Sequence, residues 1–180
     1  MSPLLRAPLS TAHALLGFVR HEPLHGYQIY RRLIDTPELK AVWRMKQSRL
    51  YALLSRMEEE GLLEAKLEIQ ATRPPRKVYH LTMAGAQAFD RWLIEPVTIP
   101  REMRLDFMLK LYFALHEGQA TAACLIKRQQ TVCEGWLATQ EEDKSNATAY
   151  LLAVRRYRRD HIVTIQQWLA SLIDDRVKSV

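Results

Sequence analysis

The feature that most constrains the fold is a change of hydrophobic period near residue 61. Between residues 47 and 60, apolar side chains follow the i, i+3, i+4, i+7 spacing of a helix that buries one face. These side chains belong to Leu50, Leu53, Leu54 and Met57. Gly61 is a natural end for that helix, and residues 62–70 alternate between apolar and polar, as in a half-buried strand. The sequence therefore predicts a helix that leads directly into a strand.

Two shorter helices are predicted before this one. The first could be capped by Ser10 or Thr11 and ends at the sequence HEP, and the second runs from about residue 25 to 35. The apolar face of the second is expected to hold Tyr27, Tyr30, Leu33 and Ile34. Pro37 closes that helix, and a loop is expected through Trp43.

A hairpin and a fourth helix are predicted after it. Residues 71–77 (ATRPPRK) are turn-like and basic, and residues 78–81 predict a second strand, so the hairpin has a basic tip. Thr82 is well placed to cap a helix that runs to about Leu93. The order helix, helix, helix, strand, turn, strand is the plan of a winged helix-turn-helix, whose third helix enters the major groove of DNA.

Pro96 and Pro100 bracket a linker, and the residues beyond it have mostly helical periodicity. We therefore predict a mainly α fold with a small β-hairpin. Its expected divisions are a winged helix-turn-helix DNA-binding domain over residues 1–95, a linker over residues 96–100 and an all-α domain over residues 101–180.

The net charge of +6 is concentrated near the N-terminus. Up to Met57 there are nine Lys and Arg residues against three acidic ones, whereas the remainder has seventeen of each sign. A basic front on a neutral body favours a polyanionic partner, either nucleic acid or a membrane surface. Because the chain has no long apolar run and no signal-peptide pattern, we expect a cytoplasmic protein.

The sequence HEPLH, residues 21–25, fits the H-E-x-x-H pattern of zinc proteases. That chemistry needs both histidines on one face of a helix, with the glutamate beside them as general base. Pro23 disfavours a helix there, so His21 and His25 are not expected to share a face. We interpret the stretch as a junction between two helices.

No catalytic set is recognisable elsewhere. The six histidines are scattered, and there is no Ser/His/Asp set, phosphate loop or metal-ligand spacing, so we predict no enzyme activity, metal or cofactor. Cys124 and Cys133 are nine residues apart, which places them on opposite sides of a helix. They are expected to remain separate thiols, as in a reducing compartment.

Four stretches of the sequence resemble the PadR-type transcriptional regulators. They are PLHGYQIYRRL from Pro23, SRLYALLSRMEEEGLLEA from Ser48, RPPRKVYHLTMAG from Arg73 and FMLKLYFA from Phe107. Their order and spacing match the family from about Leu9 to Leu115, and the length matches members with a larger helical C-terminal domain. The chain departs from the pattern at Ala71-Thr72-Arg73, where a glycine before the arginine is common, and its C-terminal third lies in the part that varies most within the family.

The resemblance implies a sequence-specific DNA-binding regulator. Members are dimers, mostly repressors, that bind dyad-symmetric operators, often of an ATGT…ACAT type, and some leave DNA when they bind a phenolic or other small aromatic compound. In the family the C-terminal helices make the dimer, so residues 101–180 are expected to be an all-α dimerisation domain. The alternative is a winged-helix module for protein–protein contacts with no specific DNA target.

Nine residues are the candidate DNA contacts. Those of the third helix are expected to reach bases or phosphates, and those of the wing to reach phosphates or the minor groove. The candidates are Lys46, Ser48, Arg49, Tyr51, Ser55 and Arg56 in the helix and Arg73, Arg76 and Lys77 in the wing. Glu58, Glu59 and Glu60 should lie away from phosphates, and the alternative for the whole set is a solvated surface.

Two further surfaces are proposed from the sequence. The dimer interface is expected along a stripe of the last helix, unless that stripe packs only within its own chain. The stripe comprises Leu151, Val154, Ile165, Trp168 and Leu172. An aromatic effector site is the second, and ordinary core packing is its alternative. Its candidate residues are Trp43, Trp92, Trp136, Trp168, Tyr112 and Phe113.

Overall fold

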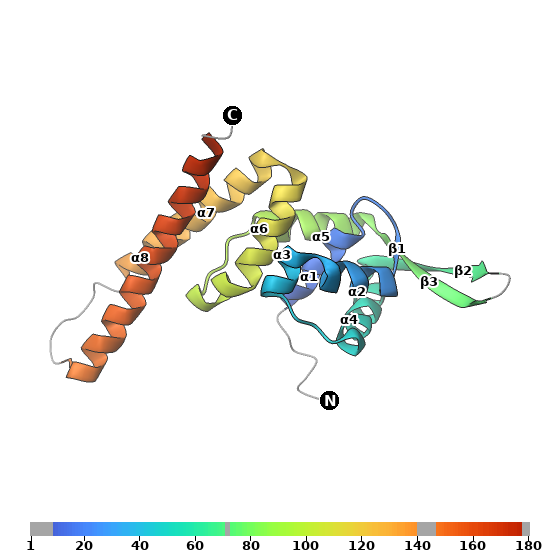
Figure 1. The fold of residues 1–180 in the computed structure, drawn as a ribbon, viewed down its shortest axis with the longest axis horizontal. Coiled ribbons are helices and arrows are strands. Elements are labelled where there is room, and N and C mark those ends of the chain that lie inside the picture. The colour runs from blue at the N-terminus through green and yellow to red at the C-terminus, as the bar shows by residue number, and fades with distance from the viewer. Residues whose placement is uncertain (1–8, 71–72, 140–146, 178–180) are drawn as a thin grey trace.

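The computed structural model describes residues 9–70, 73–139 and 147–177, in which one small antiparallel sheet lies at one end of a mainly helical molecule (Figure 1). The N-terminal elements are α1 (Leu9–Phe18), β1 (Leu24–His25), α2 (Gly26–Asp35), α3 (Pro37–Val42), α4 (Gln47–Glu59), β2 (Leu63–Gln70), β3 (Arg73–Leu81) and α5 (Met83–Ile94). The C-terminal elements are the 3₁₀ helix η2 (Pro100–Arg104), α6 (Asp106–Glu117), α7 (Gln119–Ala138) and α8 (Ala149–Val177). The hairpin and α8 lie at opposite ends of the molecule (Figure 1). The predicted mainly α class with a winged helix-turn-helix is confirmed.

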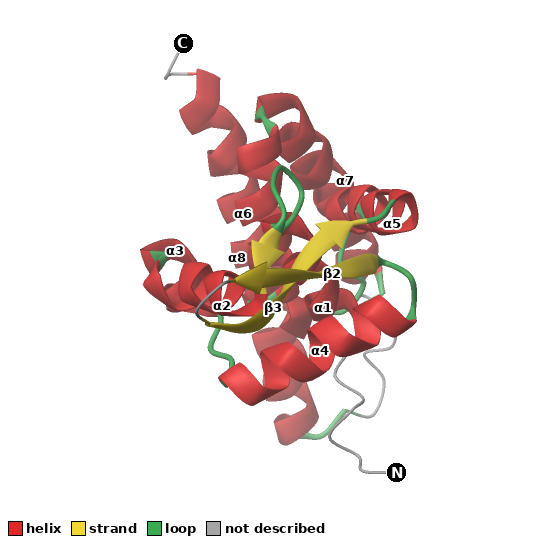
Figure 2. Cartoon of the chain, turned by 90° about the vertical axis from the view of Figure 1, so that its right-hand side faces the viewer, coloured by secondary structure: helices red, strands yellow, loops and turns green. Residues whose placement is uncertain are grey.

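The predicted passage from helix to strand at residue 61 is confirmed. Gly61 has φ +71°, a left-handed conformation that favours glycine, and the Leu62 N–H donates to the Met57 carbonyl at 2.9 Å. Leu50, Leu54 and Met57 lie on one face of α4 and are buried. Viewed from the hairpin end, α4 runs alongside the strands (Figure 2). The turn thus fixes the angle between α4 and the wing.

The sheet has a third strand that the sequence did not predict. β1 pairs antiparallel with β3 through Leu24 opposite Tyr79 and His25 opposite Val78, so the strand order is β1-β3-β2. β3 also begins earlier than predicted, at Arg73, so Arg76 and Lys77 lie in a strand and not in the turn. The turn predicted over residues 71–77 is therefore a strand from Arg73 onward, and residues 71–72 lie outside the described residues. β1 ends at residue 25, and this leaves one side of β3 open at Pro74-Pro75, where a missing N–H is tolerated.

Three smaller expectations for the N-terminal helices were wrong. Pro37 starts the short helix α3 instead of ending in a loop, because proline suits the first turn of a helix. In α2 Leu33 is buried as predicted, but the other buried side chain is Ile29, whereas Tyr27 is 56% exposed. Thr11 lies inside α1, and its hydroxyl donates to the buried carboxylate of Asp106 at 2.8 Å.

The cap predicted at Thr82 is confirmed. Its hydroxyl oxygen accepts the Gly85 N–H at 3.0 Å and donates to the Gly61 carbonyl at 2.7 Å. A Cβ at Gly85 would lie 2.0 Å from the Leu62 carbonyl oxygen. One threonine and one glycine therefore join the end of β3, the start of α5 and the turn after α4.

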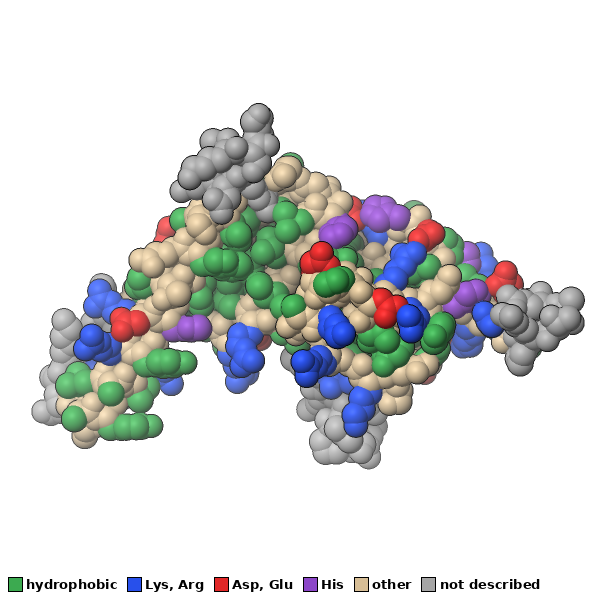
Figure 3. All heavy atoms as spheres, in the orientation of Figure 1, with side chains coloured by type: hydrophobic (Ala, Val, Ile, Leu, Met, Phe, Trp, Pro, Cys, Tyr) green, Lys and Arg blue, Asp and Glu red, His purple; other side chains and the backbone are tan. Residues whose placement is uncertain are grey.

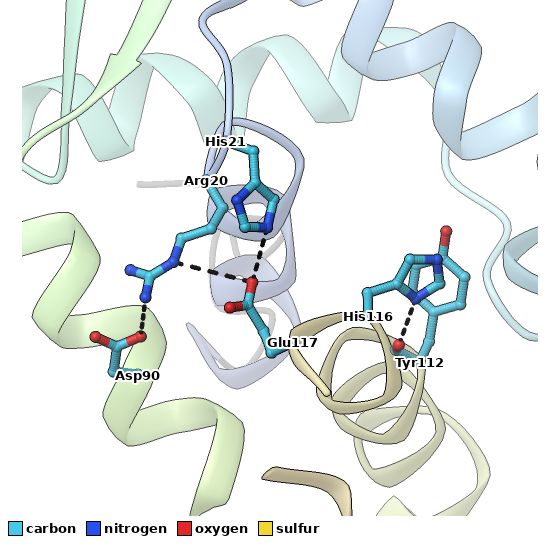
Figure 4. Close-up of polar contacts among 6 residues, drawn as sticks. All are labelled: Arg20, His21, Asp90, Tyr112, His116 and Glu117. Atoms are coloured by element: carbon cyan, nitrogen blue, oxygen red, sulfur yellow. Dashed lines mark hydrogen bonds and ion pairs between the residues drawn. The ribbon is translucent and has the colours of Figure 1, made fainter. Parts of the chain in front are cut away.

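The helix α6 is packed against the winged part of the chain. Phe18 of α1 and Phe89 of α5 both meet Phe113 edge to face, at ring distances of 5.5 and 5.7 Å. At the surface above them, Arg20 pairs with Asp90 at 2.9 Å, and His21 Nε2 lies 3.1 Å from a carboxylate oxygen of Glu117 (Figure 4). One hydrophobic core therefore runs across residues 96–100, and the division into domains there stays a prediction.

The segment predicted as a linker is held by side chains of α6 and α7. The buried Gln129 amide bonds both the N–H and the carbonyl of Val97, at 2.8 and 3.0 Å, and the Trp136 indole donates to the Thr98 carbonyl at 2.9 Å. The Lys110 ammonium donates to the Trp92 carbonyl and sits 4.5 Å from the centre of the Trp92 ring. These contacts fix the end of α5 relative to the C-terminal helices.

Among the described residues, the side chains of α8 that are buried against the rest of the chain lie between residues 162 and 169. Ile165 and Leu169 are buried, and Trp168 meets Phe107 at a ring distance of 5.9 Å. In its N-terminal half Tyr150 and Tyr157 are 80% and 71% exposed. In the space-filling view, Lys and Arg side chains lie along the lower edge of the molecule, including the free end of α8 (Figure 3). Within the described residues, no helix is both long and apolar enough to cross a membrane.

The two cysteines are free thiols, as predicted. Cys133 is buried and Cys124 is partly buried. Burial raises the pKa of the Cys133 thiol to about 11.

Lys110 should make stability depend on pH. Burial lowers its pKa in the folded protein to about 8 from an ordinary 10.5, so between these values the unfolded chain binds more protons and stability rises with pH. We expect the free energy of urea unfolding to rise between pH 8 and 10 in the wild type relative to Lys110→Met, by up to about 3 kcal/mol. The raised pKa of Cys133 lowers stability as the pH rises above 9, but this contribution is the same in both proteins and cancels when they are compared. Parallel stability curves would contradict the prediction.

Candidate nucleic-acid interface

The start of α4 is open on its outer side. Its N-cap, Lys46, has extended backbone and no side chain that caps the first turn. Lys46, Ser48 and Arg49 are exposed there, and Tyr51 and Ser55 continue the same surface along the helix. The first-turn N–H groups and two cations thus meet at one end of a helix, where anionic groups bind favourably.

A groove of about 920 Å³ separates α4 from the wing. Its walls come from the start of α2, the outer face of α4 and the middle of β3. The lining residues are His25, Gly26, Tyr27, Gln28, Tyr51, Ser55, Arg76, Lys77 and Tyr79. Aromatic rings, hydroxyl groups and cations therefore share one concave surface.

The floor of this groove depends on a glycine. A Cβ at Gly26 would lie 2.6 Å from Cε1 of the Tyr51 ring, so only glycine lets the ring lie over the start of α2. The His25 N–H donates to the Gln28 side chain at 2.8 Å, which begins α2 at this point. Leu24, opposite Tyr79 on β3, is buried.

These contacts explain the sequence HEPLH. Residues 21–22 form a bend, residue 23 is irregular and residues 24–25 form β1, so no helix runs through residues 21–25, as predicted. Among the described residues, no group of three or more His, Cys, Asp or Glu side chains is placed to hold a metal ion. The stretch positions the entry to α2 against the wing.

Several basic side chains of β1, α4 and β3 lie close to carboxylates. The Lys77 ammonium lies 2.9 Å from Glu58, and the hydrogen bond to that carboxylate raises the pKa of Lys77. Arg56 pairs with Glu60 at 2.7 Å, and His25 Nε2 lies 3.2 Å from Glu68. The surface therefore carries both positive and negative side chains and is not uniformly positive.

The nine candidate DNA contacts fall into three groups. Tyr51, Ser55, Arg76 and Lys77 line the groove. Lys46, Ser48 and Arg49 surround the open start of α4, and Arg56 is partly buried behind it. The side chain of Arg73 lies outside the described residues. The structure thus describes the side chains of eight of the nine, and their roles stay predictions.

The groove also holds residues that sequence reasoning missed. Tyr27 is the main one, because its place in the helical period suggested a buried side chain. A signal was present in the pairing of Gly26 with Tyr27, since a glycine at the start of a helix often marks close approach of another group. Gln28 and His25 reach the groove as well.

The predicted dimer stripe does not lie on one continuous free surface. Ile165 is buried and Trp168 and Leu172 are partly buried within this chain, whereas Leu151 is exposed and Val154 partly so. The apolar residues left uncovered on α8 by described residues lie mostly in its N-terminal half, at Tyr150, Leu151, Leu152 and Tyr157. The role of the stripe stays a prediction.

The six candidate effector residues do not line one cavity. Trp92 and Phe113 pack in the core with Phe89, and Trp136 binds the backbone at Thr98. Trp43 instead lies at a separate cavity of about 420 Å³ between α1, α4 and η2. The charged residues that line that cavity are Arg44, Arg49, Arg101, Glu102 and Asp106, and Leu53 and Leu105 are among the apolar ones.

Comparison with known proteins finds a family whose model matches part of this chain. Residues 15–91 match the Transcriptional regulator PadR-like family. The negative transcriptional regulator PadR of Bacillus subtilis is 35% identical over 117 residues, which are 65% of this chain and 63% of that protein. A probable transcriptional regulator of Mycobacterium tuberculosis is 27% identical over 96 residues, which are 53% of this chain and 50% of that protein. These matches span less than two thirds of the length of either relative.

Among solved structures, the chain is similar to Bacillus subtilis PadR in complex with operator DNA, with 27% identity and a TM-score of 0.46 over 91% of this chain and 97% of that one. The family match covers α2, α4, both long strands and most of α5. Three of the four stretches that suggested the family lie within it. Residues 15–91 of this chain thus form a PadR-like domain.

Proposed function

We propose that this protein is a dimeric, sequence-specific DNA-binding repressor that a small aromatic effector releases from its operator. The observation that carries the proposal is the groove between α2, α4 and β3, where Tyr27, Tyr51 and Arg76 meet on one surface. The family match and the name of the Bacillus subtilis relative, a negative regulator, support it.

In the proposed complex α4 enters the major groove with its N-terminal end. A helix of 13 residues is about 20 Å long, and the major groove admits one helix. Ser48, Tyr51 and Ser55 then face base edges, while Lys46 and Arg49 face phosphates. The wing lies along the adjacent backbone through Arg76. Glu59 and Glu60 lie at the far end of α4, away from the phosphates that its start meets.

The proposed effector site is the cavity beside Trp43. Its volume of about 420 Å³ falls within the range of small-molecule sites. Trp43 and Leu105 supply apolar walls. The lining also has three cations, Arg44, Arg49 and Arg101, against two carboxylates, Glu102 and Asp106, and this excess of positive charge suits an acidic group. Because Arg49 and Leu53 belong to α4, an anion bound there would draw Arg49 away from DNA and disturb the helix that reads it.

A winged-helix module for protein contacts remains the alternative, since exposed tyrosines also suit protein interfaces. The two functions differ in their dependence on salt. Phosphate binding weakens steeply as salt rises, whereas contacts through tyrosine and uncharged groups do not.

The first prediction concerns DNA. Fluorescence anisotropy should show tighter binding to a duplex from the upstream region of the protein's own gene than to a scrambled duplex. Ser48→Ala should reduce that preference about fivefold, the cost of one hydrogen bond of about 1 kcal/mol. Arg76→Ala should weaken both complexes and flatten the salt slope by about 0.9. Arg158→Ala, at the far end of the molecule, is the matched control. Absence of binding by the wild type at low salt would contradict the proposal.

The second prediction concerns the dimer. Light scattering after gel filtration should give about 42 kDa, twice the chain mass of 21.0 kDa. Leu152→Glu, on the exposed end of α8, should shift the mass toward the monomer, because a buried charge destabilises an apolar interface. Leu67→Glu, also exposed but in the hairpin, should leave the dimer intact. A monomeric wild type, or equal effects of both variants, would refute this interface.

The third prediction concerns the effector. Saturating 4-hydroxycinnamate, a small phenolic acid, should quench Trp43 fluorescence and weaken operator binding at least tenfold. Arg101→Met should abolish both effects and leave DNA affinity without ligand unchanged, because Arg101 lies in η2 and not in α4. Quenching that persists in Trp43→Phe would place the ligand elsewhere.

A further inference from the structure

The last turn of α4 carries a carboxylate that binds the wing. The Lys77 ammonium on β3 donates to both oxygens of Glu58, at 2.9 and 3.2 Å. Both side chains are partly exposed, so the pair lies at the surface of the groove and not beneath it. It joins the end of the proposed reading helix to the strand beside it.

The neighbouring cation of the same strand is different. Arg76 also lines the groove, and it makes no ion pair within the described part of the chain. Lys46 and Arg49 at the start of α4 likewise have no carboxylate partner among the described residues. Arg76, Lys46 and Arg49 are therefore available to phosphates at once, whereas Lys77 already holds an anion.

We propose that Glu58 is an internal competitor of DNA phosphate for Lys77. It keeps Lys77 neutralised on any duplex, so it lowers affinity for DNA of every sequence and leaves discrimination to the contacts of α4. The proposal rests on the DNA-binding function proposed above. It makes Glu58 an affinity-setting residue that acts through another side chain and touches no base.

The physical reason lies in counterion release. A cation that neutralises a phosphate releases condensed counterions, and each such contact steepens the plot of log affinity against log salt by about 0.9. A lysine that stays paired with its own carboxylate releases none. The number of phosphates counted by the salt slope should therefore be one fewer than the number of cations that face the DNA.

The same pair also has a mechanical consequence. Lys77 lies opposite Leu67 in the β2–β3 ladder, so its position is fixed by the sheet, and Glu58 is fixed by α4. Loss of the carboxylate frees the lysine to follow a phosphate without any movement of the backbone. A change in affinity after substitution at Glu58 thus requires no change of fold.

The test compares Glu58→Gln with Glu59→Gln on native and scrambled duplexes between 50 and 200 mM salt. The two variants lose the same charge at adjacent positions, but Glu59 is exposed and has no ion pair among the described residues. Glu58→Gln should bind both duplexes more tightly than Glu59→Gln and steepen the salt slope by about 0.9. Its advantage should then shrink about threefold across that salt range.

A second substitution separates competition from a general charge effect. Lys77→Gln should change the affinity of the wild type little, but it should remove the whole gain of Glu58→Gln when the two are combined. Thermal melting of each variant checks that the fold is retained. Equal slopes for Glu58→Gln and Glu59→Gln, with DNA bound by all variants, would overturn this inference and leave the proposed function standing. Absence of DNA binding by the wild type and every variant would overturn both.

Discussion

The close contact between the Tyr51 ring and Gly26 holds the proposed DNA-binding surface together. It lets α4 lie against the start of α2, and β1, directly before that glycine, pairs with β3 of the wing. Three elements distant in the sequence thus form the walls of one groove. A side chain at position 26 would push the Tyr51 ring toward that groove, because a Cβ would lie 2.6 Å from it. The shape of the proposed DNA-binding surface therefore depends on the absence of a side chain at residue 26.

Some cations of this surface form ion pairs with carboxylates, and others form none within the described chain. Lys77 and Arg56 are balanced by carboxylates of α4, whereas Arg76 and the cations at the start of α4 have no such partner in the described chain. The excess of basic residues up to Met57 gives the net charge of that segment, but it does not tell which cations are paired with carboxylates. A protein that searches among many competing sites benefits from weak binding to DNA in general.

Much of the winged part could be predicted because its signals are local. The apolar spacing of α4, the glycine at residue 61 and the Thr82 cap each specify a conformation within a few residues. β1 could not be predicted, because two residues carry no period, and its strand geometry exists only through pairing with Val78 and Tyr79. Pro37 can end one helix or begin another, and in the structure it begins α3, whose Leu39 is buried. Tyr27 was misplaced because a helical period cannot tell a core face from a groove.

The central claim is that DNA covers the start of α4 and the middle of β3, and hydrogen exchange read by mass spectrometry tests it most directly. With an operator duplex bound, amides of residues 47–55 and 76–80 should exchange more slowly, while those of α7 should not change. Protection confined to residues 149–161 of α8, or no protection near α4, would contradict the account.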